Sequence, residues 1–469
     1  MSRKAKMNMF MLIMVNLATT MSIKNWPFLA EYGFASIIFF LVSVLTFFVP
    51  VSLVSAELAS GWPEKEGIFG WVKEAFNEKL GFLAVWLLWI ENVIWYPTIF
   101  AFIVSTLSYA FSPVLATNAF YNVAISLSLF WLALICNLRG MRFSGWISSF
   151  AVIAGTLIPG ILIILFCGAN LSSSPPSEMS FSWSSFLPDF SEISQLGFLV
   201  SMSLGFAGME MNAVHANDVE NPRKNYPYAI LISGIIILAF SVLGTISVGT
   251  IIPKGEINLV TAIIEAVSRY LNIFGLSSLL PAFIIMIALG SLGGVSAWLT
   301  GTSKSLLVAG RNGHLPGFLC RVNKHKVPVS LLVLQGIIAS VMCVVFVTMP
   351  DLSSGFWTLT VLSAQLYLLM YILMFAAAIV LRYKQPGVNR SYRIPGGNLG
   401  MLVVAGVGVL GCAASFCIGF IPPANLSGYD IFLHEVYLIG GCLFFCFLPY
   451  ILTKVSERTR SRRALGEQA

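Results

Sequence analysis

Long apolar runs recur along the whole chain and are separated by short polar or charged stretches. Crossing the hydrocarbon core of a membrane requires a helix of about 20 predominantly apolar residues. The periodicity of the runs, and the Gly, Pro and charged residues that end them, predict twelve membrane-spanning helices. The predicted spans are residues 7–29, 34–59, 80–110, 119–138, 144–168, 194–216, 226–252, 273–309, 328–348, 354–381, 398–420 and 431–453.

The sixth predicted span contains a sequence that a membrane helix normally avoids. Its segment Gly205–Glu210 carries two glycines, Gly205 and Gly208, and ends in a carboxylate near the middle of the membrane. Hydrocarbon cannot satisfy freed backbone groups, so an interrupted helix at this depth must be surrounded by protein or line a watery cavity. An ionisable residue inside the membrane indicates a functional site. The pattern therefore predicts a discontinuous helix at a site.

The first predicted span is polar at the corresponding place. Thr19, Thr20 and Ser22 supply three hydroxyls within four residues. Such hydroxyls can bond to freed backbone groups or to a substrate carboxylate, and they can equally pack one helix against another. Paired with the interruption in the sixth span, they favour a binding site.

The first ten spans divide into two halves of five. Because five is odd, the second half must be inverted in the membrane, which is the repeat pattern of secondary transporters. The sequence therefore predicts an all-α polytopic membrane protein with a single transporter domain. Its parts are a first repeat (7–168), a second, inverted repeat (194–381), two additional helices (398–453) and a short basic tail (454–469).

Composition and charge agree with this prediction. The chain has 469 residues, of which 57% are hydrophobic and 10% are charged, whereas a soluble globular chain is about 25% charged. The net charge is +7, and outside the spans only Lys254 and Arg269 fall on the side opposite the other Lys and Arg residues. This distribution places both termini in the cytoplasm and does not indicate nucleic-acid binding. The basic tail is also suited to contact anionic lipid heads.

Two charged residues accompany the predicted interruptions. Lys24 lies near the outer end of the first span, where its ammonium could bind a substrate carboxylate or stabilise an outer gate, or could extend to the interface beside Trp26. Glu210 could bind an amino group, carry a proton or organise a hydrogen-bond network between spans one and six. It could also be a structural carboxylate that caps the second half of the broken helix.

Three further positions carry candidate chemistry. Glu91, followed by Asn92, lies among aromatic residues of the third span, facing either the pathway or a neighbouring helix. Trp298 in the eighth span could line a site with its ring or simply pack. Glu57 and Lys304 lie near cytoplasmic span ends, where ion pairs would form an inner gate or brace the bundle.

Several classes of function lack a signature in the sequence. The eight cysteines lie mostly in apolar spans, and neither they nor the four histidines have the spacing of a metal site. A phosphate-binding loop, a dinucleotide motif and a nucleophile elbow are all missing from the sequence. We therefore expect no metal, no cofactor and no enzymatic activity.

The segments around the sixth span resemble a known family. Gly205–Glu210 with Asn217–Pro227 resembles the sixth span and following loop of the amino acid/polyamine/organocation (APC) transporter superfamily, and Ala56–Val72 resembles its second span and following region. The segments 187–190, 251–259 and 393–397 are similar to those of the bacterial glutamate/GABA antiporter branch. The resemblance extends over essentially the whole chain.

The resemblance implies a LeuT-like fold of 5+5 inverted repeats with helices 1 and 6 discontinuous around a substrate. The residues that would bind the substrate are Thr19, Thr20, Met21, Ser22, Gly205, Phe206, Ala207, Gly208 and Trp298. Lys24, Glu91 and Glu210 would serve gating or proton coupling. The implied activity is exchange of an external amino acid for an internal amino acid or its decarboxylated amine, in a bacterial inner membrane.

The sequence departs from the family pattern in three places. The glycine-rich break of span one is replaced by Thr19–Ser22, and Lys24 stands where the glutamate/GABA branch has an aromatic residue. The tail after the last span is too short for a folded plug that gates by pH. A proton-coupled amino acid uptake permease is the alternative function, and the resemblance leaves open whether the protein forms a homodimer.

Overall fold

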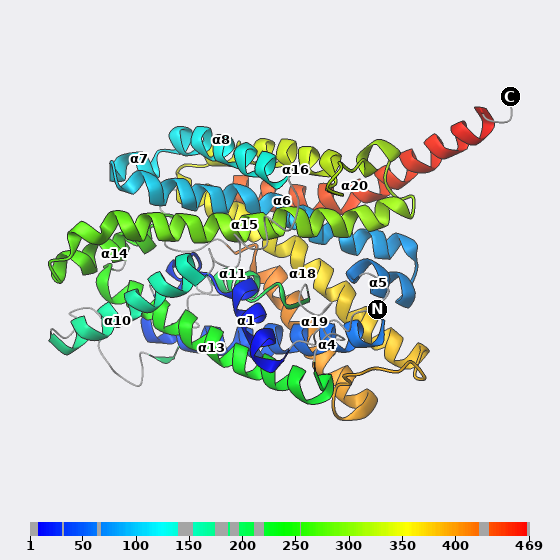
Figure 1. Cartoon of the computed structure of the whole chain (residues 1–469), viewed down its shortest axis with the longest axis horizontal. Coiled ribbons are helices and arrows are strands. Elements are labelled where there is room, and N and C mark those ends of the chain that lie inside the picture. The colour runs from blue at the N-terminus through cyan, green and yellow to red at the C-terminus, as the bar shows by residue number, and fades with distance from the viewer. Residues whose placement is uncertain are drawn as a thin grey trace.

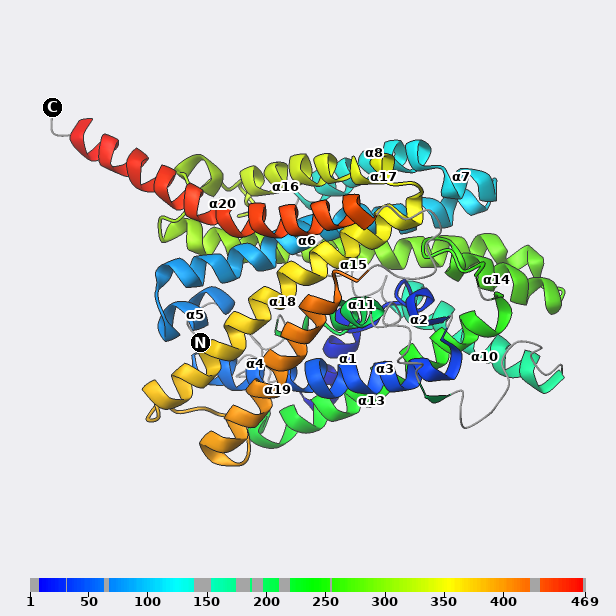
Figure 2. The same cartoon turned by 180° about the vertical axis from the view of Figure 1, so that it is seen from behind.

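The computed structural model describes residues 8–30, 32–62, 67–138, 153–173, 186–187, 197–210, 220–253, 255–421 and 431–466. These residues form helices and connecting segments, with no strand among them. Figures 1 and 2 show the long helices side by side, with the short α1 and α11 in the interior between α15 and α13. The last helix, α20, extends beyond the bundle at its C-terminal end.

The first half of the chain forms α1 to α10. The helices are α1 (Met9–Thr20), α2 (Pro27–Ala30), α3 (Ser36–Ser43), α4 (Val49–Gly61), α5 (Ile68–Ala75), α6 (Glu78–Tyr109), α7 (Pro113–Thr117), α8 (Ala119–Asn137) and α10 (Ile158–Ser173). Two π-helical segments, Val44–Phe48 and Ile153–Leu157, lead into α4 and α10.

The second half forms α11 to α20. The helices are α11 (Phe198–Gly205), α13 (Pro222–Ile251), α14 (Ala262–Ile273), α15 (Leu280–Arg311), α16 (Val329–Met342), α17 (Val345–Thr348), α18 (Leu352–Lys384), α19 (Gly397–Ile418) and α20 (Ile431–Gly466). Polar residues cap several of them: the side chains of Asn77, Asn118 and Asp351 each accept a hydrogen bond from the first turn of α6, α8 and α18.

Within the described residues, ten helical stretches are long and apolar enough to cross a membrane. They coincide with ten of the predicted spans, although residues 144–152 of the fifth span lie outside the described part. The other two predicted spans contain α1 and α11, which end after 12 and 8 residues, at Thr20 and Gly205. Both helices end where the sequence predicts an interruption. The chain is thus a multi-pass membrane protein, and its regular structure is helical throughout the described residues.

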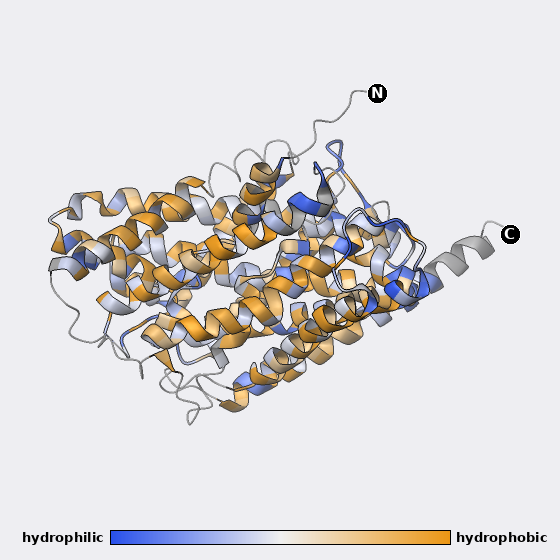
Figure 3. Ribbon diagram, turned by 90° about the horizontal axis from the view of Figure 1, so that it is seen from below, coloured by the Kyte–Doolittle hydropathy of each residue, from blue (hydrophilic) through white to orange (hydrophobic). Residues whose placement is uncertain are grey.

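The outer surface of the bundle suits a lipid environment. Large apolar side chains are exposed along the helices, including Leu410 at 71% and Phe447 at 64%. Figure 3 shows hydrophobic residues along most helices, while hydrophilic residues gather at the end of the bundle near the C-terminus. The core is built on α6 and α18, and its largest buried side chains are tryptophans such as Trp86 and Trp89.

A proline in α20 is compensated by a residue of α6. Pro449 has no backbone N–H, so the carbonyl of Phe445 loses its helical partner. The indole Nε1–H of Trp86 donates to that carbonyl at 2.9 Å. Because an unsatisfied carbonyl in hydrocarbon is costly, this bond fixes α6 against α20 at one defined height.

Glu57 at the end of α4 forms a buried ion-pair cluster. It pairs with Arg382 at the end of α18 and with Arg390, whose Nε lies 3.3 Å from the carboxylate. It also accepts the backbone N–H of Ile394 at 2.8 Å. The sequence predicts an ion pair for Glu57 but not these partners, and the cluster braces α4, α18 and the segment before α19.

Two glycines bring neighbouring backbones into direct contact. Gly155, in the second π-helical segment, faces Gly290 of α15. A Cβ added at Gly155 would lie 2.2 Å from the carbonyl oxygen of Met286 and 2.3 Å from the Cα of Gly290. Only glycine allows this approach, which is the usual way that membrane helices pack closely.

We expect Gly155→Ala to destabilise the protein by about 1–3 kcal/mol, because the added methyl group overpacks a backbone contact. Gly406→Ala on α19 is the matched control, since no atom lies within 4 Å of its added Cβ. The measurement is the thermal unfolding midpoint of each purified variant in detergent. Equal midpoints for the two variants would contradict the close contact.

Candidate functional site

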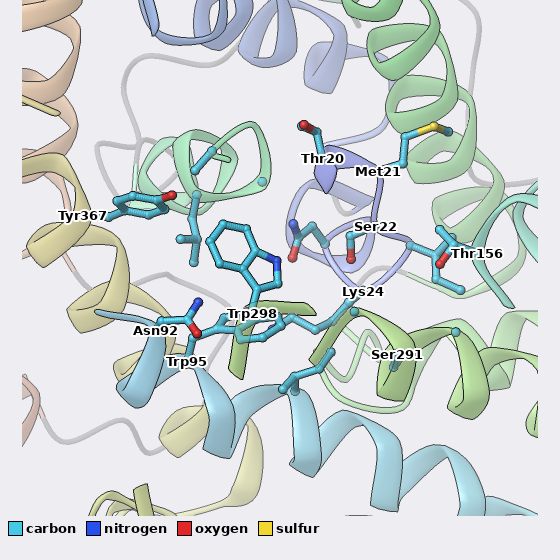
Figure 4. A pocket seen from close by; sticks show the side chains of 18 of the residues that line it. Thr20, Met21, Ser22, Lys24, Asn92, Trp95, Thr156, Ser291, Trp298 and Tyr367 are labelled. Atoms are coloured by element: carbon cyan, nitrogen blue, oxygen red, sulfur yellow. The ribbon is translucent and has the colours of Figure 1, made fainter. Parts of the chain in front are cut away.

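A polar cavity of about 130 Å³ lies where α1 and α11 end, against α6 and α15. Figure 4 shows its walls, with Thr20, Met21 and Ser22 at one side and Asn92 and Trp95 of α6 at another. The lining residues are Thr20, Met21, Ser22, Ile23, Lys24, Asn25, Glu91, Asn92, Trp95, Ile99, Thr156, Leu204, Gly205, Ala207, Gly290, Ser291, Gly294, Trp298 and Tyr367. Most of the residues predicted to bind substrate therefore meet in one cavity.

The end of α1 supplies one wall. The N–H of Met21 still bonds to the carbonyl of Leu17 at 2.9 Å, but Met21 itself has an extended backbone and the helix stops there. Helix resumes only at Pro27, so Ser22 lies on a non-helical segment that lines the cavity. Thr19 belongs to the last turn of α1, and its side chain lies outside the described part.

The end of α11 supplies the facing wall. Phe206 and Ala207 make turn-like bonds to carbonyls of the last helical turn, and Gly208 then adopts φ +112°. That conformation favours glycine. A Cβ on Gly205 would lie 2.9 Å from the Nδ2 of Asn25. Gly205 therefore permits the two interrupted segments to touch.

Phe206, Gly208 and Glu210 lie outside the lining of the cavity. The ring of Phe206 packs instead against Phe40 and Phe48, with centroids 6.2 and 5.8 Å away. Gly208 donates its backbone N–H to the hydroxyl of Tyr371 at 3.2 Å. These residues shape the interruption without facing the cavity.

Glu210 is held by two tyrosines of α18. Its carboxylate accepts hydrogen bonds from the hydroxyls of Tyr367 and Tyr371, the second at 2.5 Å. The two rings stack with centroids 4.7 Å apart, and Tyr367 lines the cavity. Glu210 is thus connected to the cavity through Tyr367. Neither tyrosine is among the site residues predicted from the sequence, where their only signal is a spacing of one helical turn in a predicted span.

Lys24 is buried against α6, with 3% of its surface exposed. Its Nζ donates to the hydroxyl of Thr98 at 3.0 Å and lies over the rings of Trp95 and Phe356, 5.2 and 5.1 Å from their centroids. No carboxylate of the described residues lies within 4.0 Å of this ammonium. The side chain therefore faces the cavity and does not extend to the membrane surface.

Glu91 and Asn92 form a region of hydrogen-bond acceptors on the same helix. Ser363 donates to the Oε2 of Glu91 at 3.2 Å, whereas Glu91 Oε1 and Asn92 Oδ1 have no hydrogen-bond partner among the described residues. Glu91 and Thr98 are seven residues apart on α6, which corresponds to about 10 Å along the helix axis. The cavity thus has acceptors toward one end and an ammonium toward the other.

Trp298 of α15 divides these two regions. In Figure 4 its indole projects into the cavity, with Tyr367 and Asn92 on one side and Ser22 and Lys24 on the other. Its ring can cover the apolar part of a small molecule that bridges the two ends. A cavity with separated acceptor and cationic regions suits a ligand with both an ammonium and a carboxylate.

Comparison with known proteins gives the family. A family model described as amino acid permease matches residues 8–443. The chain is 40% identical to an uncharacterized transporter of Legionella pneumophila, covering 96% of this chain and 97% of the relative. It is 29% identical to a glutamate/gamma-aminobutyrate antiporter of Lactococcus lactis (97% and 91% covered) and 25% identical to a probable agmatine/putrescine antiporter of the same species (79% and 78% covered). The chain therefore belongs to the amino acid permease family of membrane transporters.

Proposed function

We propose that the protein is a secondary active antiporter that exchanges an external amino acid for an internal amino acid or its decarboxylated amine. The main support for this proposal is the cavity between the ends of α1 and α11. It is lined by the buried Lys24, which has no anionic partner among the described residues. Two relatives bear the names of glutamate/gamma-aminobutyrate and agmatine/putrescine antiporters, which supports exchange.

The proposed fold is LeuT-like, with twelve membrane helices. Residues 7–168 and 194–381 are two inverted five-helix repeats, 398–453 contribute two additional helices, and both termini face the cytoplasm. The positions at which α1 and α11 end support this arrangement, because they correspond in the two repeats. The bacterial relatives support an inner-membrane location.

In this proposal the substrate lies between the two polar regions of the cavity. Its carboxylate binds the ammonium of Lys24 and the hydroxyls of Thr20 and Ser22, while its amino group faces Glu91 and Asn92. A hydrogen bond to a charged partner contributes about 1.5–3 kcal/mol. Rocking of one group of helices against another then opens the site to either side in turn.

Strict exchange leads to a direct expectation in proteoliposomes. Uptake of labelled amino acid should require unlabelled amino acid inside the vesicles, because the empty carrier returns slowly. The measurement is the initial rate of uptake with preloaded and with empty vesicles. Rapid uptake into empty vesicles that follows an imposed proton gradient would support instead a proton-coupled uptake permease.

We expect Lys24→Gln to weaken apparent substrate affinity by about 10- to 100-fold, because a charged hydrogen bond to the carboxylate is lost. Counterflow in proteoliposomes gives the KM and the maximal rate. Lys324→Gln, which removes an exposed charge, is the matched control and should transport normally. An unchanged KM in Lys24→Gln would remove Lys24 from the proposed site.

Glu210 is the proposed position for proton coupling. If exchange responds to pH through this carboxylate, Glu210→Gln should exchange amino acids at a rate that no longer varies with pH. Tyr371→Phe is the comparison variant, since it removes the hydrogen bonds of this hydroxyl to Glu210 and to the Gly208 N–H but keeps the titratable group, so its exchange rate should still vary with pH. The measurement is the exchange rate from acidic to neutral pH. A wild-type pH response that persists in Glu210→Gln would assign this carboxylate a structural role.

A further inference from the structure

A second cavity, separate from the proposed substrate site, opens on the surface between α6 and α20. It has a volume of about 220 Å³. Its walls combine two lysines with mostly apolar side chains, and the lining residues are Lys79, Leu80, Phe82, Leu83, Cys446, Pro449, Tyr450, Thr453, Lys454 and Glu457. We refer to this cavity as the α6–α20 groove.

The groove follows from the way the two helices are held together. The bond from Trp86 to the carbonyl of Phe445 fixes α6 against α20. The lining residues of α6 all precede Trp86, and those of α20 all follow Phe445. The groove therefore occupies the region beyond this fixed point, toward the start of α6. Pro449, which frees that carbonyl, is itself part of the apolar wall.

The positive charges of the groove lie at the expected height of lipid head groups. Lys79 immediately precedes the predicted apolar span 80–110, and Lys454 immediately follows the span 431–453. Both lysines therefore mark the same membrane boundary, on the side that carries most of the Lys and Arg residues. Lysines at this level interact with anionic lipids at about 1 kcal/mol each.

Within the described residues, no carboxylate lies within 4.0 Å of the Nζ of either lysine. Glu78, next to Lys79, pairs with Lys73 at 2.5 Å and lies 3.7 Å from His314. The Nζ of Lys454 lies 4.5 Å from the ring centroid of Tyr450, a side chain that is 54% exposed. Glu457 is the one carboxylate that lines the groove, so its lining carries one net positive charge.

We propose that the α6–α20 groove binds one anionic phospholipid. The phosphate lies between Lys79 and Lys454, and an acyl chain runs along the wall formed by Leu80, Leu83 and Pro449. A free phosphate ion would use the lysines alone and would leave the apolar wall exposed. The combination of a charged rim and an apolar wall at the membrane boundary matches a complete lipid.

The experiment uses the full-length protein, purified in a mild detergent and analysed by native mass spectrometry. Phosphatidylglycerol and phosphatidylcholine of equal chain length are titrated in turn. We expect phosphatidylglycerol to bind with one site at about tenfold or higher affinity, given two lysines at the head-group level. The Lys79→Gln, Lys454→Gln double variant should lose this preference.

Matched variants separate the site from overall charge. Arg321→Gln with Lys324→Gln removes two exposed charges elsewhere and should keep the preference. Leu83→Gln should weaken retention of phosphatidylglycerol, because it makes the apolar wall polar and leaves the charge of the groove unchanged. Glycerol phosphate, which has no acyl chain, should not compete. Four results would each overturn the proposal. They are equal loss of the preference in both double variants, binding of phosphatidylcholine with the same affinity, displacement of the lipid by glycerol phosphate, and a second copy of the chain covering the groove in detergent.

Discussion

Every backbone polar group at membrane depth needs a partner, and this constraint determines how the interior of the protein is built. Where α11 stops, the N–H of Gly208 bonds to the hydroxyl of Tyr371. Where Pro449 removes a helical bond, Trp86 supplies the missing donor. These two interruptions are thus each matched by a polar side chain from a neighbouring helix. At the end of α11, the backbone beside the cavity can leave the helix because α18 provides such a partner.

Buried charged side chains also need partners, and in this respect Lys24 differs from Glu57 and Glu210. Glu57 is neutralised by Arg382 and Arg390, and Glu210 is held by two tyrosine hydroxyls. Lys24 has one hydroxyl and two aromatic rings, but no carboxylate among the described residues within ion-pairing distance. A buried charge without a counter-charge is unfavourable. The first two groups have their partners within the described residues, whereas in the proposed exchange Lys24 takes an anionic ligand as its partner.

The sequence predicts the interruptions better than it predicts the side chains that support them. Glycines inside an apolar span and hydroxyls in a neighbouring one are local signals, so the ends of α1 and α11 could be anticipated. Tyr367, Tyr371 and Thr98 could not, because their roles depend on how α18 and α6 are rotated toward the cavity. The burial of Lys24 was one of several alternatives for the same reason. Pairing across helices is set by packing, which a single sequence does not report.

For the proposed exchange, the charge of Lys24 also supplies a physical basis for strict dependence on a counter-substrate. Alternating access passes through a closed state in which water is excluded from the cavity. In the empty carrier that state would keep the ammonium buried with no carboxylate of the described residues within ion-pairing distance, which would raise the barrier to return. A bound carboxylate removes this penalty, so reorientation is fast only with substrate in place. On this view the returning substrate must also carry a carboxylate. A decarboxylated amine that keeps a second carboxylate would return the carrier efficiently, whereas a diamine would not.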